Sequence, residues 1–287
     1  MAQRVWLRCK EVLDRALDAA QVRVVLDVGA RDCAESADFA RAYPGATVFA
    51  FECNAATLPQ CRAVAAAEPR IVLTEKAVSD RAGRLSFYPT NPDRTITSFA
   101  TGNPGASSLF EASGAYPEET YAQDRIEVDA IRLDQFCATH GLDAIDILWM
   151  DVQGAEELVL RGLGALLQRV KFIHLEAEFF EIYRGQALFP TIDALLRGAG
   201  FRLAGFTSYS QYAADALYAG PTTGFAVRAA RRALPYLGRN LAKYRRHRLK
   251  RALRRALGLA EWPDAAPQAA PNAASHAAPQ APSKGRS

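Results

Sequence analysis

The feature that most constrains the fold of this chain is a series of short, continuously apolar runs that alternate with segments of helical spacing. The clearest runs cover residues 23–28, 47–52 and 145–151. A strand that is apolar at consecutive positions is buried on both faces, as in a parallel sheet. The alternation therefore predicts a doubly wound, Rossmann-like α/β sheet with right-handed crossovers and helices on both faces. In such a sheet, ligands bind beyond the carboxyl ends of the strands.

The other expected elements complete this pattern. Further strands are expected at residues 70–75, 171–177, 201–206 and 214–218. The last of them is expected to run antiparallel in an otherwise mostly parallel sheet. Helices are expected at residues 2–20, 34–42, 56–68, 154–168 and 189–199.

Residues 81–121 interrupt the alternation. This stretch is rich in Gly, Pro, Ser, Thr and Asn, and one short strand is expected in it, at residues 85–88. A loop of such length inside a compact domain is usually functional or disordered. Residues 125–133 then alternate apolar and polar side chains, which predicts a strand with one solvated face.

The charges of the chain are unevenly distributed, although the formal net charge is only +4. Between Arg228 and Arg255 lie twelve Lys or Arg residues and no acidic residue. Without these twelve, the other 23 basic residues of the chain face 31 acidic ones. The body of the protein is therefore acidic, and one segment near the C-terminus is strongly basic.

These patterns predict four parts in the chain. They are an N-terminal helix (1–22), an α/β domain (23–222), a basic amphipathic helical segment (223–260) and an Ala/Pro-rich tail (261–287). A break in the basic segment is expected at Pro235. The tail has too few large apolar side chains to offset its chain entropy, so we expect it to be disordered.

Several functional classes are not expected from the composition. No run of eighteen apolar residues occurs, so no segment should span a membrane. The first twenty residues carry charges throughout and lack the apolar core of a signal peptide. The five cysteines contain no CxxC pair, which favours free thiols in a reducing compartment. The four histidines are scattered, so no metal site is expected. We therefore expect a cytoplasmic protein.

Two acidic residues and a glycine at strand ends point to a bound ligand. Gly29 directly follows the first strand and allows a sharp turn close to a ligand. The N-terminus of the helix that begins near Ala34 favours an anionic group, whereas Asp27 attracts an ammonium or sulfonium group. Glu52, 23 residues after Gly29, stands where an acid accepts hydrogen bonds from two ribose hydroxyls. The absence of a GxGxxG pattern after the first strand argues against a dinucleotide.

A series of motifs extends over residues 24–218. In chain order they are DVGARD at 27–32, FECN at 51–54, GASSL at 105–109, RLD at 132–134, MDVQGAE at 150–156, LEAEF at 175–179 and YRGQALF at 183–189. By their order and spacing, the chain resembles the FkbM family of methyltransferases. The resemblance implies a class I methyltransferase fold, S-adenosylmethionine as cofactor, and methylation of hydroxyl groups on sugars or natural products.

The resemblance also implies which residues bind the cofactor. They are Asp27, Gly29, Ala30, Arg31, Asp32, Ser36, Glu52, Cys53, Ala77, Val78 and Asp151. The loop after the first strand and Ser36 would surround the methionine part, Glu52 would hold the ribose, and Ala77 and Val78 would border the adenine. The chain departs from the usual pattern at two positions. Cys33 stands where many methyltransferases have glycine, and Arg31, where Asn is common, can itself bind the methionine carboxylate.

Three carboxylates are candidates for the catalytic base. Methyl transfer to oxygen is a direct displacement, which requires alignment of the acceptor and removal of its proton. Asp151 ends a buried strand at the ligand edge, where an acid is costly unless it is used or paired; it can also cap the next helix. Glu176 and Glu178 share one face at the end of the following strand, and they can instead form a solvated edge. All three can also orient sugar hydroxyls while water takes the proton.

The acceptor is expected to contact four residues, and one histidine nearby is expected to be structural. The four residues are Ser107, Ser108, Gln153 and Glu178. The serines lie in a loop that offers hydroxyls and a flexible backbone, which is also compatible with an ordinary surface loop. His174, deeper in the strand of Glu176, is expected to be a core histidine.

The basic segment combines its charges with large apolar residues. Leu234, Leu237, Leu241, Tyr244, Leu249, Leu253 and Leu257 follow one another at steps of three to five, which is compatible with a single apolar stripe. A basic amphipathic helix over residues 228–257 predicts contact with an anionic membrane, such as the inner face of the plasma membrane. Such contact suits an enzyme of lipid-linked glycans. The alternative is a solvated helix whose stripe packs on the acidic body. No motif that reads nucleic acid accompanies the charge, so no such partner is expected.

The sequence therefore favours an O-methyltransferase that acts on a hydroxyl of a sugar, glycan or related natural product. The alternative is an inactive methyltransferase-fold module that binds membrane or nucleic acid through its basic segment. An N-methyltransferase is less favoured, because no Asn/Asp-Pro-Pro-aromatic segment follows the strand at residues 145–151.

Overall fold

The protein is described here by a computed structural model that covers residues 2–257. Its main sheet, within these residues, consists of β1 (Val24–Val28), β2 (Thr47–Phe51), β3 (Ile71–Thr74), β7 (Ile145–Met150), β8 (Val170–Glu178), β9 (Arg202–Phe206) and β10 (Ala213–Ala219). The strand order is β3-β2-β1-β7-β8-β10-β9. Neighbouring strands pair in parallel, except that β10 is antiparallel to both β8 and β9. The predicted doubly wound sheet with an antiparallel last strand is confirmed.

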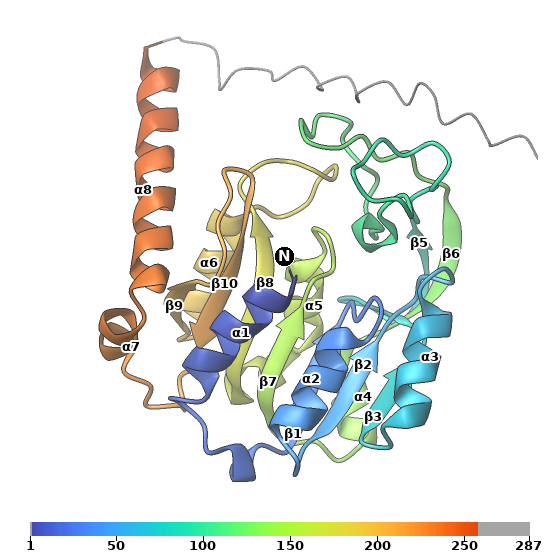
Figure 1. Cartoon of the computed structure of the whole chain (residues 1–287), viewed down its shortest axis with the longest axis vertical. Helices are drawn as coiled ribbons and strands as arrows, with labels where there is room; N and C mark the ends of the chain where they lie inside the picture. The colour runs from blue at the N-terminus through green and yellow to red at the C-terminus, as the bar shows by residue number, and fades with distance from the viewer. Residues whose placement is uncertain (1, 258–287) are drawn as a thin grey trace, which may run out of the picture.

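Helices cover both faces of this sheet (Figure 1). They are α1 (Ala2–Leu13), α2 (Ala34–Ala42), α3 (Leu58–Ala67), α4 (Leu133–Thr139), α5 (Glu156–Gly162), α6 (Phe189–Gly198), α7 (Val227–Ala233) and α8 (Pro235–Ala256). Successive strand residues point to opposite faces, so Val25 of β1 joins the cluster of α1, α2 and α3. Leu26 and Val28 join the cluster of α4, α5 and α6 on the other face. The central strands β1, β2 and β7 are mostly apolar because both of their faces are covered.

Two helices differ from their predicted bounds, and one further helix was not predicted. α1 ends at Leu13, and a 3₁₀ turn at Ala19–Gln21 follows it. The expected helix at 154–168 is α5 followed by a 3₁₀ helix at Gly164–Arg169. It breaks there because Gly164 has a φ of +51°, in the left-handed region, which ends a regular helix. α4 was not expected; it is short and buries Leu133 and Cys137.

The long insertion is tied into the fold above the carboxyl edge of the sheet. β4 (Ala77–Val78), β5 (Gly83–Phe87) and β6 (Ile126–Ile131) form a small second sheet in the order β4-β6-β5. Between β5 and β6, isolated antiparallel bridges pair Tyr88 with Ser108, Thr90 with Gln123, and Ile96 with Thr120. Figure 1 shows these green and teal loops above the ends of β1 and β2. The insertion is therefore placed to border a ligand site.

The basic segment forms α7 and α8, with the expected break at Pro235, the first residue of α8. The predicted single apolar stripe is wrong. Leu237, Leu241 and Tyr244 are buried against the sheet, whereas Leu249 and Leu253 are 60% and 53% exposed. Five residues separate Tyr244 from Leu249, a rotation of roughly 140° around a helix of 3.6 residues per turn. The two sets of apolar residues therefore lie on different sides of α8.

Two predictions on the termini stay predictions. The predicted disordered tail (261–287) and the last residues of the basic segment lie outside the described residues. The division into a helix at 1–22 and a domain at 23–222 also stays a prediction, and α1 packs on the common core through Trp6 and Val12. Within residues 2–257, no helix is long and apolar enough to cross a membrane.

Candidate active site

The turn after β1 brings three structural elements together. Gly29 has a φ of +81°, and a Cβ at this position would lie 2.0 Å from the backbone oxygen of Asp151. The backbone N–H groups of Gly29 and Ala30 both donate to the carbonyl of Phe51, at 3.0 Å each. Glycine is required here because a side chain would separate the turn from the end of β7. The carboxyl ends of β1, β2 and β7 therefore meet at this turn.

The two unusual residues of the turn do not prevent it from closing. Arg31 and Cys33 both adopt left-handed backbone, with φ values of 50° and 56°. The Cys33 side chain is fully buried, and the thiol of Cys61 on α3 donates to the Arg31 carbonyl at 3.0 Å. Cys33 thus takes the conformation that glycine supplies elsewhere, at some cost in backbone strain.

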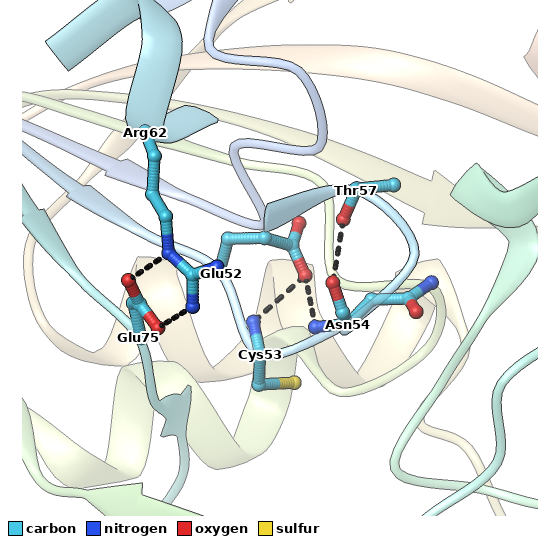
Figure 2. A network of polar contacts seen from close by, with 6 residues as sticks. All are labelled: Glu52, Cys53, Asn54, Thr57, Arg62 and Glu75. Atoms are coloured by element: carbon cyan, nitrogen blue, oxygen red, sulfur yellow. Dashed lines mark hydrogen bonds and ion pairs between the residues drawn. The ribbon is translucent and has the colours of Figure 1, made fainter. Parts of the chain in front are cut away.

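Glu52 is held at the end of β2 by backbone donors (Figure 2). Its Oε1 accepts from the N–H of Cys53 at 2.7 Å and of Asn54 at 2.6 Å, and its Oε2 accepts from the N–H of Arg31 at 2.8 Å. Burial raises the pKa of Glu52, and these hydrogen bonds act in the opposite direction. A carboxylate has about four acceptor sites, so Oε2 keeps one for a ligand hydroxyl.

The end of β3 is fixed beside Glu52. Arg62 of α3 donates two hydrogen bonds to Glu75, at 2.7 and 2.6 Å, as Figure 2 shows. The pair is exposed, so it contributes little to stability. Its effect is to orient the chain that continues into Lys76, Ala77 and Val78 at the side of the site.

A pocket opens between these strand ends and the insertion. It is lined by Val28, Gly29, Arg31, Phe51, Glu52, Cys53, Lys76, Ala77, Val78, Phe87, Pro104, Gly105, Ser107, Ser108, Leu109, Asp151 and Val152. The pocket lies where the chain, after building the sheet outward from β1 to β3, returns to place β7 on the other side of β1. This topological switch point is where open α/β sheets bind their ligands.

Seven of the eleven predicted cofactor residues line this pocket. They are Gly29, Arg31, Glu52, Cys53, Ala77, Val78 and Asp151. The other four predicted residues are not part of the pocket lining, so their contact with a cofactor stays a prediction. They are Asp27, Ala30, Asp32 and Ser36. Asp27 is 1% exposed and accepts a hydrogen bond from the Ser36 hydroxyl. Its burial raises the pKa of Asp27 to about 7.

Gln153 connects the candidate base to the insertion. Its Nε2 donates to Asp151 at 2.7 Å and to Glu176 at 2.8 Å, and its Oε1 lies 2.7 Å from the Tyr183 hydroxyl. The backbone oxygen of Gln153 accepts from the Ser108 hydroxyl at 2.7 Å. The predicted acceptor residues Ser108 and Gln153 and two of the predicted carboxylates therefore form one hydrogen-bonded group.

The carboxylates of this group differ in their access to solvent. Asp151 is exposed at the pocket, Glu176 is half-buried, and Glu178 is 1% exposed. Surrounding protein raises the pKa of Asp151, while hydrogen bonds from Gln153 and Glu176 and the charge of Arg31 act against the rise. Burial and then the Asp151 charge raise the pKa of Glu176 well above its usual range. Asp151 is therefore the carboxylate of this group that is open to the pocket, and Gln153 joins it to the less accessible Glu176.

Glu178 and His174 lie away from the pocket lining. Neither carboxylate oxygen of Glu178 has a hydrogen-bond partner among the described residues, and burial raises its pKa to about 8. The roles predicted for Glu178 as base and acceptor ligand stay predictions. His174 stacks on Trp149 with ring centroids 3.8 Å apart, and its Nε2 lies 3.0 Å from the Thr207 hydroxyl. Burial lowers the pKa of His174 to about 3, so it is the neutral core histidine that was predicted.

The hydroxyls of the predicted serines hold the insertion in place. Ser107 donates to the Pro104 carbonyl at 2.8 Å and accepts from the Asn54 amide at 3.1 Å. Tyr183 reaches the same segment, with its hydroxyl 2.8 Å from the Ala106 carbonyl. Both serines line the pocket, but each hydroxyl already donates its proton within the protein, Ser107 to the Pro104 carbonyl and Ser108 to the Gln153 carbonyl.

Several residues of the site were not predicted. Lys76 and Val152 line the pocket directly after β3 and β7, where the position at a strand end was an available signal. Phe87 lines it from β5, and its alternation with the solvent-facing residues of that strand was visible in the sequence. Tyr183 lies in the YRGQALF motif, but only the fold shows that it reaches Gln153.

The glycine turn, the acid at the end of β2 and the pocket at the switch point together define a class I S-adenosylmethionine-dependent methyltransferase. Residues 27–203 match the family model described as the methyltransferase FkbM domain. The chain belongs to the FkbM methyltransferase family, as the motifs indicated.

Two relatives bear names that describe their reactions. The chain is 34% identical over 175 residues to the 2-O-methyltransferase NoeI of Sinorhizobium fredii, covering 60% of this chain and 70% of that protein. It is 31% identical over 197 residues to the 31-O-demethyl-FK506 methyltransferase FkbM of Streptomyces tacrolimicus, covering 62% and 72%.

Solved structures that align with the chain are more distant. Aeropyrum pernix fibrillarin with natively bound S-adenosyl-L-methionine is 10% identical, with a TM-score of 0.41 over 75% of this chain and 76% of that one. Precorrin-6y C5,15-methyltransferase from Geobacter metallireducens is 14% identical, with a TM-score of 0.38 over 75% and 88%.

Proposed function

We propose that this methyltransferase transfers the methyl group of S-adenosylmethionine to a hydroxyl of a sugar, glycan or related natural product. The observation that carries the proposal is the place of Asp151. Asp151 is exposed and lines the same pocket as Glu52, and its backbone carbonyl lies directly against the Gly29 turn. A proton acceptor beside the expected cofactor site suits a hydroxyl, which must lose its proton as it is methylated.

The pocket residues fit the cofactor. The free acceptor site on Glu52 Oε2 suits a ribose hydroxyl, and Ala77 and Val78 offer apolar surface for the adenine ring. The Arg31 guanidinium at the pocket suits the methionine carboxylate. When bound, the cofactor supplies an electrophilic methyl group on a sulfonium centre. The negative charge of Asp151 stabilises such a cationic centre.

The transfer needs a base, and Asp151 is the residue proposed for it. Asp151 would accept the proton that the acceptor hydroxyl loses when it takes the methyl group from the cofactor. Gln153 holds the Asp151 carboxylate by a hydrogen bond that favours its ionised form. The carboxylates of Asp151 and Glu176 are also suited to orient neighbouring sugar hydroxyls.

The acceptor class is supported by the relatives and by the insertion. Both relatives described above are named for methylation of a hydroxyl oxygen. The segment at 104–109, which lines one side of the pocket, is the part of the chain best placed to contact the acceptor. We further propose that the acceptor is lipid-linked, and that the enzyme works in the cytoplasm, at the inner face of the plasma membrane.

Two measurements test the proposal. Calorimetric titration with S-adenosylhomocysteine should give micromolar affinity for the wild type, and Glu52→Ala should lose most of it because the ribose acceptor is removed. Methyl transfer to a panel of sugars and glycans, followed by mass spectrometry, should detect a methyl ether whose formation Asp151→Asn reduces about 100-fold or more. A folded wild type that binds no S-adenosylhomocysteine would instead favour the inactive module.

A further inference from the structure

The large apolar side chains that face solvent are concentrated in two segments. Eight such side chains are exposed within the described part of the chain, and five of them belong to α8 with the residue after it and to the insertion. They are Leu249, Leu253, Leu257, Ile96 and Phe99, each between 53% and 71% exposed. Single exposed apolar residues need no explanation, but grouping of this kind marks a contact surface.

The outer side of α8 has the character of a membrane-binding helix. Leu249, Leu253 and Leu257 recur every four residues, so they form one row along the helix. Arg246 and Lys250, both exposed, lie beside this row. The inner side of the helix already packs on the sheet through Leu241 and Tyr244, so the outer row is not needed for the fold. Leucines flanked by cations suit an anionic lipid surface.

The insertion provides a second apolar point. Ile96 and Phe99 are 58% and 57% exposed, and residues 95–103 contain no charged side chain. The nearest basic residue, Arg94, is paired with Asp124 at 2.5 Å. The Glu119 carboxylate accepts hydrogen bonds from Thr97 and Asn103 of this loop and fixes its base. The aromatic and aliphatic side chains of the loop are suited to enter the interfacial layer of a bilayer.

Both segments lie on the same side of the molecule. In Figure 1 the C-terminal half of α8 and the loops of the insertion rise on opposite flanks of the edge toward which the parallel strands point. The pocket opens at that edge, beneath the segment at 104–109. The pocket therefore lies at the end of the molecule toward which both segments extend.

We propose that the outer row of α8 (Leu249, Leu253 and Leu257, with Arg246 and Lys250) and the loop at Ile96 and Phe99 form one two-point docking face for an anionic phospholipid bilayer. Docking through both points turns the pocket toward the lipid surface. The α8 row supplies apolar and electrostatic contact, and the loop fixes the orientation. This orientation serves a lipid-linked acceptor, and in that respect the inference rests on the proposed function.

Co-sedimentation of the full chain with vesicles tests the face without any acceptor. Wild-type protein should bind vesicles of phosphatidylcholine with 30 mol% phosphatidylglycerol, about ten times more tightly than vesicles of phosphatidylcholine alone, and salt should weaken the binding. The double variants Leu249→Ser/Leu253→Ser and Ile96→Ser/Phe99→Ser should each reduce it about tenfold. Leu7→Ser is the matched control, because Leu7 is 54% exposed on α1, outside the proposed face.

Each outcome decides the proposal. Loss of binding in both double variants, with Leu7→Ser unchanged, supports the two-point face. The proposal is overturned if only the α8 variant loses binding, if the control loses as much as the double variants, or if the wild type does not bind anionic vesicles. It is also overturned if the full chain binds duplex DNA in preference to the vesicles. Titration with S-adenosylhomocysteine checks that every variant is folded. It also separates failure of the docking face from failure of the methyltransferase site.

Discussion

At the scale of single residues, the Gln153 side chain forms hydrogen bonds with the carboxylates of Asp151 and Glu176 and with the hydroxyl of Tyr183. A carboxamide is suited to this position because it carries two donors and an acceptor and has no charge. Its bond to Asp151 lowers the pKa of that carboxyl, and its bond to Glu176 fixes the distance between the two acids. Gln153 is therefore a positioning residue for the candidate base.

The variant Gln153→Asn tests this role. Asn tolerates the left-handed backbone at this position, where φ is 53°, but it is too short to reach both carboxylates. We expect kcat to fall about tenfold, and the acidic limb of the pH profile to move to higher pH because Asp151 loses a hydrogen bond that favours its ionised form. Affinity for S-adenosylhomocysteine should change little. Gln135→Asn, at an exposed position on α4, is the control, and an unshifted pH profile in Gln153→Asn would rule the role out.

Gly29 tests how closely the turn must approach β7. In Gly29→Ala the new Cβ would lie 2.0 Å from the Asp151 carbonyl oxygen, in addition to the strain of a left-handed alanine. Gly141→Ala is the matched control, since its φ is +65° and its Cβ would meet nothing within 4 Å. We expect the control to lose about 1–2 kcal/mol in urea unfolding and to keep cofactor affinity. Gly29→Ala should lose more stability and most of the affinity; equal behaviour of the two variants would contradict the close approach.

At the scale of elements, Asp146 ties three central strands together at the end opposite the pocket. Its Oδ2 accepts from the N–H groups of Arg23 and Val24, at 2.7 and 2.9 Å, and its Oδ1 lies 2.6 Å from the Lys171 ammonium. Asp146→Ala leaves two backbone donors without their partner, so the free energy of unfolding should fall by about 2 kcal/mol. Lys171→Ala should cost much less, because that side chain is 41% exposed. The rate of methyl transfer by folded Asp146→Ala should stay near that of the wild type. A large loss of activity would show that this end of the sheet is coupled to the pocket.

The accuracy of the sequence predictions also follows the elements. β1, β2 and β7 were predicted within a residue or two because their buried runs carry a signal at every position. α4 was missed because seven residues are too few for a helical period to stand out. The acids Glu52 and Asp151 were found because strand ends in this fold meet at one edge. Their relative accessibility was not predictable, because it depends on Gln153 and on the insertion, which contact them only in the folded chain.

At the scale of the whole molecule, several acids lie near the edge of the main sheet where its parallel strands end. Burial raises the pKa of Asp215 to about 6, of Asp27 to about 7 and of Glu178 to about 8, and it raises the pKa of Glu156 and Glu176 as well. An acid whose pKa is higher in the folded state binds more protons there than in the unfolded chain. Its favourable contribution is therefore complete below the unfolded pKa near 4 and is lost as the pH rises through the folded value. The stability of the free protein should decrease from about pH 5 to about pH 8.

Glu178→Gln isolates one of these acids, whose pKa burial raises to about 8. The substitution keeps the volume of the side chain and removes its charge, so the variant should match the wild type near pH 5 and exceed it near pH 8, on the order of 2 kcal/mol. Urea unfolding at both pH values measures the difference, with Glu127→Gln on the exposed face of β6 as the control. Neither Glu178 carboxylate oxygen has a hydrogen-bond partner of good geometry among the residues described, and the nearby Gln186 amide, which lowers the Glu178 pKa, can also face the amide that the substitution introduces. If Glu178→Gln loses stability equally at both pH values, the Glu178 carboxyl is a packing element, and its burial does not set the pH dependence of the fold.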